Sequence, residues 1–218
     1  MSYSLIGIFY DLDGTLVDSH RCIRETYREL CYAAGIRPRL SSRILSRIGH
    51  DWKKFLRRKN LEPEKAEEIY RMKIEKIKVF PEVKRILKYN KKNEKVQGIV
   101  THSPRDVVEE ILKKNKIKKL IDGMVTWDDI EEKGLRPKPE PDTLLYLARD
   151  LNLETKSCLY IGNSKEDIVA GKKAGMLTLG VSYDVDYKNI INLVTARPHL
   201  GVITSPHQLY IYFTRLIL

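Results

Sequence analysis

The run Asp11-Leu12-Asp13-Gly14 places two carboxylates two residues apart, directly after the apolar segment Leu5 to Tyr10. That segment has the composition of a buried β-strand. Because side chains alternate along a strand, Asp11 and Asp13 point the same way, and Gly14 lets the chain turn behind them. Two adjacent carboxylates repel each other unless a cation lies between them or one holds a proton, and both conditions suit catalysis. The structural alternative is a turn or a helix cap, since Asp-Gly is a common turn dipeptide.

The elements that must position these acids form an alternating pattern. Five apolar runs of strand length are Leu5–Tyr10, Val96–Thr101, Gly123–Thr126, Cys158–Gly162 and Leu177–Val181. Continuous apolar strands are typical of a parallel sheet that is covered on both faces. Helical segments lie between them, among them one capped by Ser103 with Pro104 at its first position, then Glu140–Leu151 and Lys165–Ala174. The pattern predicts an α/β fold with a Rossmann-like, doubly wound, mostly parallel sheet.

One interval breaks this alternation. Residues 18–80 contain no convincing strand but carry helical periodicity in three segments, and they are too many for a crossover loop. We therefore expect an all-helical cap subdomain over residues 18–80, inserted into an α/β core formed by residues 1–17 and 81–218. The end of the chain predicts an edge strand over His199–Ile203 and a terminal helix over Gln208–Leu218.

Composition narrows the class of protein. The chain has 218 residues, a length that can bury a core without metal or disulfide support. Its formal charge is +11. Its three cysteines, Cys22, Cys31 and Cys158, lack the spacing of a zinc site, so we expect buried thiols. It has no apolar run of membrane-spanning length, and no basic residues precede its first apolar run. These features predict a soluble, cytoplasmic protein.

With Asp11-Leu12-Asp13-Gly14-Thr15, three further stretches occur in a fixed order. Val96 to Thr101 ends an apolar run with a hydroxyl, Lys138-Pro139-Glu140-Pro141 stands at an expected helix start, and Tyr160 to Asp167 ends in acids. This ordered set resembles the haloacid dehalogenase superfamily of aspartate-nucleophile hydrolases, and in particular its phosphoglycolate-phosphatase-like members. The matching stretches span residues 8 to 181.

The resemblance implies a role for each matched residue. Asp11 would attack phosphorus as the nucleophile, and Asp13 would donate and then accept a proton. Thr101 would bond a phosphoryl oxygen, while Lys138 would offset the gathered negative charge. Mg²⁺ is the implied cofactor, with the expected ligands Asp11, Asp13 through its backbone carbonyl, Asn163 and Asp167. Gly14 and Thr15 would lie beside the substrate. His102 would either contact the substrate or pack at a strand end.

Asn163 departs from the family pattern, which usually has an aspartate there as a metal ligand. An asparagine supplies one neutral oxygen in place of a negative charge, so we expect weaker metal binding. Asp167 also has a structural interpretation, because Ser164 and Asp167 form the pattern of a helix capping box. The two roles of Asp167 are compatible.

The expected cap is strongly basic. Nine basic residues and one acid lie between Arg37 and Lys59. A cap of this kind closes over the active site, so a basic lining would favour a substrate with a second anionic group. Arg43 and Arg47, four residues apart on one helix face, are our candidates for such contacts. The alternative is a helix face that is simply solvated.

These observations predict a Mg²⁺-dependent phosphatase that acts on a small phosphorylated metabolite through an aspartyl-phosphate. A phosphomutase of the same fold is one alternative. A weakly active or non-catalytic member that binds polyanions through its basic cap is another, although nucleic-acid binding is disfavoured because aromatic and basic residues do not interleave. The sequence does not indicate the particular substrate or the oligomeric state.

Overall fold

The computed structural model describes residues 5–38, 52–183 and 187–215. Its central sheet contains β1 (Gly7–Tyr10), β4 (Val96–Val100), β5 (Gly123–Val125), β6 (Cys158–Gly162), β7 (Leu177–Val181) and β8 (Val202–Ile203). The spatial order is β5-β4-β1-β6-β7-β8, and every adjacent pair is parallel. The predicted doubly wound sheet is confirmed, and the predicted bounds of β6 and β7 match the structure residue for residue.

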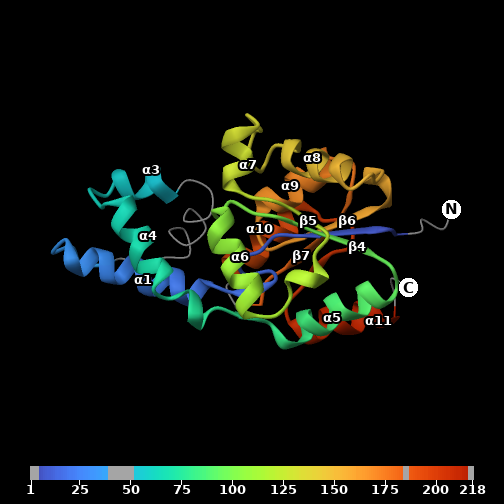
Figure 1. Ribbon diagram of the computed structural model, residues 1–218, viewed down its shortest axis with the longest axis horizontal. Coiled ribbons are helices and arrows are strands. Elements are labelled where there is room, and N and C mark those ends of the chain that lie inside the picture. The colour runs from blue at the N-terminus through green and yellow to red at the C-terminus, as the bar shows by residue number, and fades with distance from the viewer. Residues whose placement is uncertain (1–4, 39–51, 184–186, 216–218) are drawn as a thin grey trace.

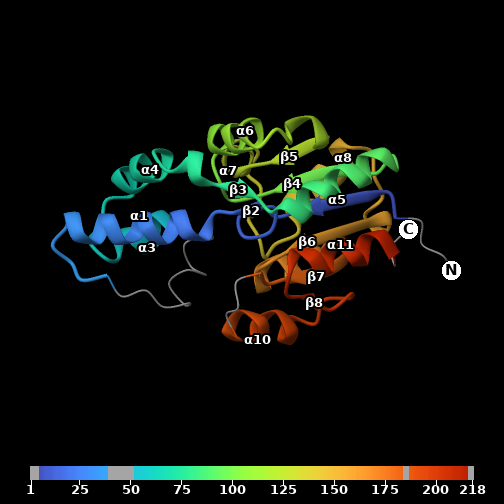
Figure 2. The same cartoon turned by 90° about the horizontal axis from the view of Figure 1, so that it is seen from below.

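Helices cover both faces of this sheet (Figures 1 and 2). One face carries α5 (Pro81–Lys92), α6 (Arg105–Lys114) and α11 (Pro206–Arg215), and the other carries α7 (Trp127–Glu132), α8 (Asp142–Asp150) and α9 (Lys165–Lys173). Helix α10 (Tyr187–Ala196) packs against α9 and β8. Two short 3-10 helices, η2 (Lys118–Leu120) and η3 (Thr155–Ser157), lead into β5 and β6.

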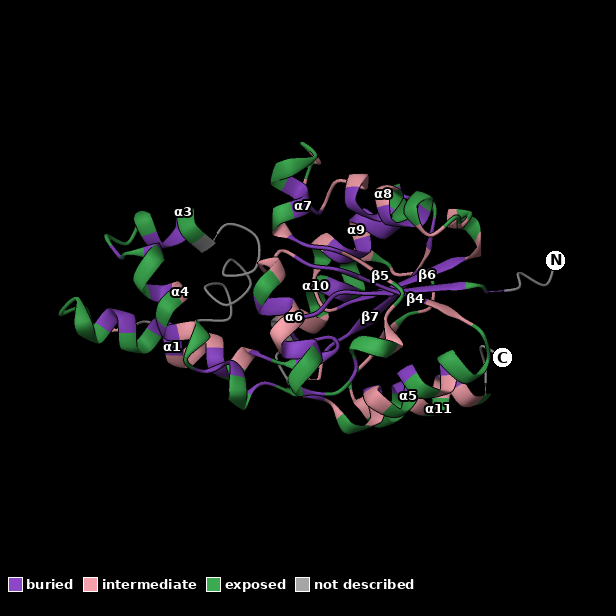
Figure 3. Cartoon of the chain, in the orientation of Figure 1, coloured by how far each residue is buried: buried purple, intermediate pink, exposed green. Residues whose placement is uncertain are grey.

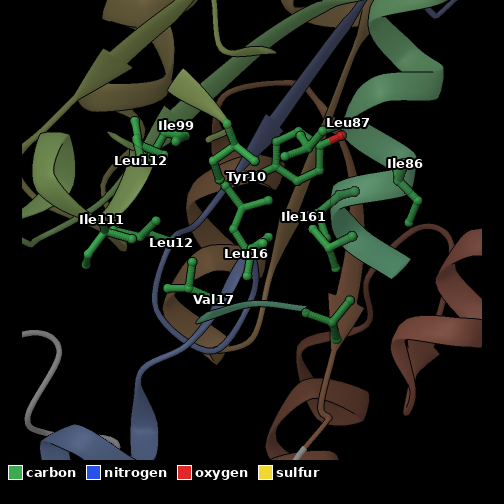
Figure 4. Close-up of a cluster of buried hydrophobic side chains, with 14 of the residues drawn as sticks. Tyr10, Leu12, Leu16, Val17, Ile86, Leu87, Ile99, Ile111, Leu112 and Ile161 are labelled. Carbon is green, nitrogen blue, oxygen red and sulfur yellow. The ribbon is translucent and has the colours of Figure 1, made fainter. Parts of the chain in front are cut away.

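The alternation of side chains along each strand divides the core between these two faces. In β1, Ile8 and Tyr10 belong to the cluster beneath α5 and α6, while Phe9 belongs to the cluster beneath α8 and α9. Figure 4 shows part of the first cluster, with Tyr10 and Ile161 close to Ile86 and Leu87 of α5. Because both faces are covered, the central strands β1 and β6 are buried along their whole length, and β4 and β7 are buried after their first residue (Figure 3).

The segment after β1 forms α1 (His20–Ala33), α3 (Trp52–Arg57), α4 (Pro63–Arg71) and η1 (Ile74–Lys76). These helices lie together at the end of the molecule toward which β1 runs (Figure 1). They have their own hydrophobic cluster, made of Tyr27, Leu30, Cys31, Phe55, Leu56, Leu61, Ala66 and Ile69. A separate cluster means that this segment is held together by its own packing as well as by the sheet.

The connections into and out of this helical segment pair with each other. β2 (Val17–Asp18) and β3 (Lys78–Val79) form a two-stranded antiparallel sheet, with Val17 opposite Val79 and Asp18 opposite Lys78. The expectation that residues 18–80 contain no strand is therefore wrong at their two ends. Pairs of this length have no room to show the period-two pattern that reveals a strand in sequence.

Two further expectations need correction. Helix α6 begins at Arg105 with Pro104 before it, and Ser103 does not cap it, because the Ser103 hydroxyl is bonded to Asp13 instead. The terminal helix α11 begins at Pro206, two residues before the predicted start. The three cysteines are buried and unpaired, as predicted. Within the described residues, no helix is long and apolar enough to span a membrane.

Candidate active site

The candidate site lies at the carboxyl edge of the central strands. Asp11 follows β1, Thr101 follows β4 and Asn163 follows β6, so three motifs far apart in sequence meet at one edge. The strand order reverses here, because the chain runs from β1 to β4 and β5 on one side and then crosses to β6 on the other side of β1. In open α/β sheets, ligands bind outside the carboxyl ends of strands at such a point.

Lys138 joins the motifs. Its side chain is 5% exposed, and its Nζ donates to Asp11 Oδ1 at 2.8 Å and to Asp167 Oδ1 at 2.7 Å. It also donates to the Tyr160 hydroxyl at 3.1 Å and to the Val100 carbonyl at 3.2 Å. Although burial lowers the pKa of Lys138, the two carboxylates hold it well above the usual range. The lysine therefore stays charged and ties β1, β4 and β6 together.

Asp11 is buried in this network. Burial raises the pKa of Asp11 to about 7; the charge of Lys138 lowers it, and the charges of Asp167 and Asp13 raise it again. Thr15, also buried, places its hydroxyl 3.4 Å from Asp11 Oδ2. The carboxyl group is therefore surrounded by more negative than positive charge.

Asp167 has both carboxylate oxygens engaged. Oδ1 accepts hydrogen bonds from Lys138 and from the Tyr160 hydroxyl, the latter at 2.9 Å. Oδ2 accepts from the backbone nitrogen and the hydroxyl of Ser164 at 2.9 and 2.6 Å, which completes the predicted capping box of α9. Burial raises the pKa of Asp167, but Lys138 and these hydrogen bonds outweigh it and hold the pKa below the usual range. Its observed contacts position Lys138, whereas its metal-ligand role stays a prediction.

Asp13 is held on one side only. The Ser103 hydroxyl donates to Asp13 Oδ2 at 2.7 Å. The other oxygen, Oδ1, is buried and has no hydrogen-bond partner among the described residues. Tyr70 faces this carboxylate from α4: burial raises the pKa of the tyrosine well above its usual range, and the charge of Asp13 raises it further. A residue of the helical segment thus reaches the stretch that carries Asp11 and Asp13.

Three other predicted site residues, Thr101, Gly14 and His102, lie in the described part of the chain. Thr101 is buried after β4, and its hydroxyl accepts a hydrogen bond from the Ser103 backbone at 3.1 Å. Gly14 adopts φ of +76°, which favours glycine, so the turn predicted behind Asp13 is present. The His102 ring lies edge-on to Trp127 with centroids 6.0 Å apart, which fits packing at a strand end. Arg43 and Arg47 lie outside the described residues.

Asn163 lies beside residues that the sequence analysis did not select. Its Nδ2 is 3.3 Å from Nε2 of His20, the first residue of α1. Asn189 of α10 donates to the Asn163 carbonyl at 3.1 Å. With Gly14, Asp18, Phe80, Ser182 and Tyr183, these three residues line a small pocket.

Comparison with known proteins identifies the architecture. The family model described as haloacid dehalogenase-like hydrolase matches residues 8–181. The chain belongs to this family. It is 26% identical over 201 residues to a phosphoglycolate phosphatase from Photorhabdus laumondii, covering 86% of this chain and 84% of that protein.

Solved structures agree with this assignment. A hydrolase from Pseudomonas syringae superposes with a TM-score of 0.78 at 25% identity, covering 98% of this chain and 100% of that one. A β-phosphoglucomutase from Clostridium difficile shares the fold, with a TM-score of 0.75 at 20% identity over 94% and 93% of the two chains. The predicted resemblance to phosphoglycolate phosphatases and the prediction of a hydrolase from this phosphatase-containing family are confirmed.

The haloacid dehalogenase-like site has the charge to attract a divalent cation. Three carboxylates, Asp11, Asp13 and Asp167, stand against one ammonium group, which leaves a formal charge of −2 when all are ionised. Asp13 Oδ1 is a buried oxygen without a partner in the described structure. Among the described residues, no three His, Cys, Asp or Glu side chains lie close enough together to form a metal site by themselves. This donor set fits Mg²⁺, which binds through one or two carboxylates and keeps its remaining ligands as water or phosphate.

Sequence reasoning missed Tyr160, Ser103, Tyr70 and His20. Tyr160 could have been found, because in a strand that ends beside Asn163 its polar hydroxyl needs a buried partner. Ser103 was assigned to the more common role of helix cap. Tyr70 and His20 come from the helical segment, and nothing local to their sequence reports that α1 and α4 fold back onto the motif.

Proposed function

We propose that the protein is a Mg²⁺-dependent phosphomonoester hydrolase that acts on a small anionic metabolite through an aspartyl-phosphate. The observation that carries the proposal is the buried Lys138 between Asp11 and Asp167, together with Asp13, whose Oδ1 is buried and has no hydrogen-bond partner among the described residues. The likeness to phosphoglycolate phosphatases supports the substrate class.

Asp11 would be the nucleophile. Its Oδ1 accepts from Lys138, so Oδ2, which has only the 3.4 Å contact to Thr15, would attack phosphorus. Attack needs the ionised carboxylate, whereas burial and two neighbouring acids favour the neutral form. Mg²⁺, when bound by Asp11, the backbone carbonyl of Asp13 and Asn163, would supply the positive charge that keeps Asp11 ionised and would polarise the phosphoryl group.

Asp13 would move the proton. Because Ser103 occupies Oδ2, the proton would reside on Oδ1 and pass to the leaving oxygen of the ester. The same oxygen would then take a proton from the water that hydrolyses the aspartyl-phosphate. Lys138 would offset the charge of the transferring group, and the Thr101 hydroxyl would donate to one of its oxygens.

Residues 18–80 would serve as the cap over this site. The β2–β3 ladder holds both connections of that segment side by side, and Tyr70 extends from α4 toward Asp13. Closure would exclude water from the aspartyl-phosphate until the leaving group has departed. The basic lining proposed for the cap, through Arg43 and Arg47, would favour substrates with a second anionic group.

Polyanion binding through two further basic segments outside the cap, residues 84–95 and 113–119, is disfavoured by ion pairing. Several lysines of the basic segments at 84–95 and 113–119 contact acids, including Lys91 with Asp122 and Lys118 with Glu109. Such pairs reduce the charge that could neutralise a phosphate backbone.

The test is release of inorganic phosphate from p-nitrophenyl phosphate and from a panel of small phosphorylated metabolites, with Mg²⁺ or with EDTA. We expect phosphate release with Mg²⁺ and a loss of about a thousandfold or more in Asp11→Asn. Asp150→Asn, an exposed acid at the end of α8, is the matched control and should retain activity. Full activity in Asp11→Asn would reject the nucleophile, and conversion of a sugar phosphate to its isomer without free phosphate would instead support the phosphomutase alternative.

A further inference from the structure

The contact between His20 and Asn163 joins the start of α1 to the end of β6 across 143 residues of sequence. The two nearest atoms are both nitrogen, Asn163 Nδ2 and His20 Nε2, at 3.3 Å. An amide NH₂ group only donates, so a hydrogen bond between them requires Nε2 to accept. Within this hydrogen bond, Nδ1 is the ring nitrogen of His20 that carries the proton.

The surroundings hold this arrangement in place. A Cβ atom on Gly14 would lie 2.4 Å from Asn163 Nδ2 and 2.5 Å from His20 Cε1, so both side chains pack directly on the glycine. The backbone carbonyl of Asn163 accepts a hydrogen bond from Asn189 Nδ2, which holds the main chain at this residue. The amide nitrogen therefore faces His20 and Gly14, and the amide oxygen, on the other branch of the planar group, faces away from the histidine.

We propose that His20 is a positioning residue that orients the Asn163 amide, so that Oδ1 is presented to the cation bound by Asp11 and Asp13. This inference rests on the proposed function. The physical reason is the difference in symmetry between an aspartate and an asparagine side chain at position 163. A carboxylate offers two equivalent oxygens, whereas an amide that turns by half a rotation offers an NH₂ group, which cannot bind a cation.

The need for His20 thus follows from asparagine at position 163. Because His20 is the first residue of α1, the orientation of this ligand also depends on where the helical segment begins. A shift of α1 away from Gly14 would release the amide, and the cation would lose an oriented oxygen.

The test measures binding of Mg²⁺ alone, by calorimetric titration without substrate. In the natural protein, His20→Ala should weaken Mg²⁺ binding about tenfold, the usual size of an effect exerted through a ligand's hydrogen-bond partner. His20→Gln should restore most of this affinity, because its side-chain oxygen can accept from Asn163 Nδ2. In an Asn163→Asp background, His20→Ala should have little effect, since either oxygen of the aspartate can bind. His207→Ala, an exposed histidine of α11, is the matched control and should leave the affinity unchanged.

A second measurement does not depend on Mg²⁺ at all. Nitrogen NMR of the His20 ring in the Mg²⁺-free protein should show the proton on Nδ1, and this state should be lost in Asn163→Ala. Unchanged Mg²⁺ affinity in His20→Ala, or an equal loss in both backgrounds, would overturn the proposal, as would a proton on Nε2. A protein that binds Mg²⁺ with this pattern but releases no phosphate would refute the proposed function and leave this inference intact.

Discussion

Replacement of Asp11, the proposed nucleophile, should stabilise the protein. Burial, together with the charges of Asp167 and Asp13, raises the pKa of Asp11 from 3.8 to about 7, although Lys138 opposes the shift. The folded state therefore favours the neutral carboxyl group, and ionisation of Asp11 at neutral pH costs folding free energy. Asparagine has the shape of that neutral form and cannot ionise, so Asp11→Asn should remove this cost.

The magnitude follows from the two pKa values. At about 1.4 kcal/mol for each tenfold change, the interval between 3.8 and about 7 corresponds to roughly 4 kcal/mol at pH 8. A raised folded pKa gives stability that is present below the unfolded pKa and is lost as the pH rises through the folded pKa. The variant and the natural protein should thus be equally stable near pH 4, and the variant should gain its advantage between about pH 4 and pH 7.

The assay is urea unfolding in EDTA at a series of pH values, followed by circular dichroism, with Asp150→Asn as the matched control. Addition of Mg²⁺ should narrow the difference at pH 8, because a cation that binds ionised Asp11 stabilises the natural protein selectively. Equal free energies of unfolding at pH 8 in EDTA would refute the electrostatic account of the site. So would a control that showed the same gain.

Three further changes probe the same network. Asp167→Asn should cost about 3 to 5 kcal/mol of unfolding free energy, because Lys138 loses a buried charged partner. Since the charge of Asp167 raises the pKa of Asp11, the variant should also lose its Asp11-linked stability at lower pH. Urea unfolding across pH tests both effects. Tyr160→Phe should cost about 1 to 3 kcal/mol through loss of the hydroxyl bonded to Lys138 and Asp167, and an unchanged urea midpoint would contradict this. Gly14→Ala should cost about 1 to 3 kcal/mol more than Gly134→Ala in the same assay. Both glycines have positive φ, but nothing lies within 4 Å of a Cβ at Gly134. Equal costs would mean that Asn163 can move away from the new methyl group without loss of stability.

Several strands and the ordered motifs could be predicted because their signals are local. A strand buried on both faces is mostly apolar, so β6 and β7 are visible as nearly continuous apolar runs with sharp ends. Asp11, Thr101 and Asn163 each follow one of these visible strands, and the parallel sheet brings them to one edge. The short ladder of Val17 and Val79 gave no such signal, because each strand contributes two residues.

What the sequence determined by itself was the set of candidate reacting groups and the sheet that carries them. Only the tertiary structure decided which partner each group has. Lys138 lies between Asp11 and Asp167, Ser103 donates to Asp13 instead of capping α6, and His20 faces Asn163. The reason is physical. A strand pattern depends on neighbours one or two residues apart, whereas a buried charge takes as its partner whichever group the fold brings within about 3 Å, and sequence distance sets no limit on that choice.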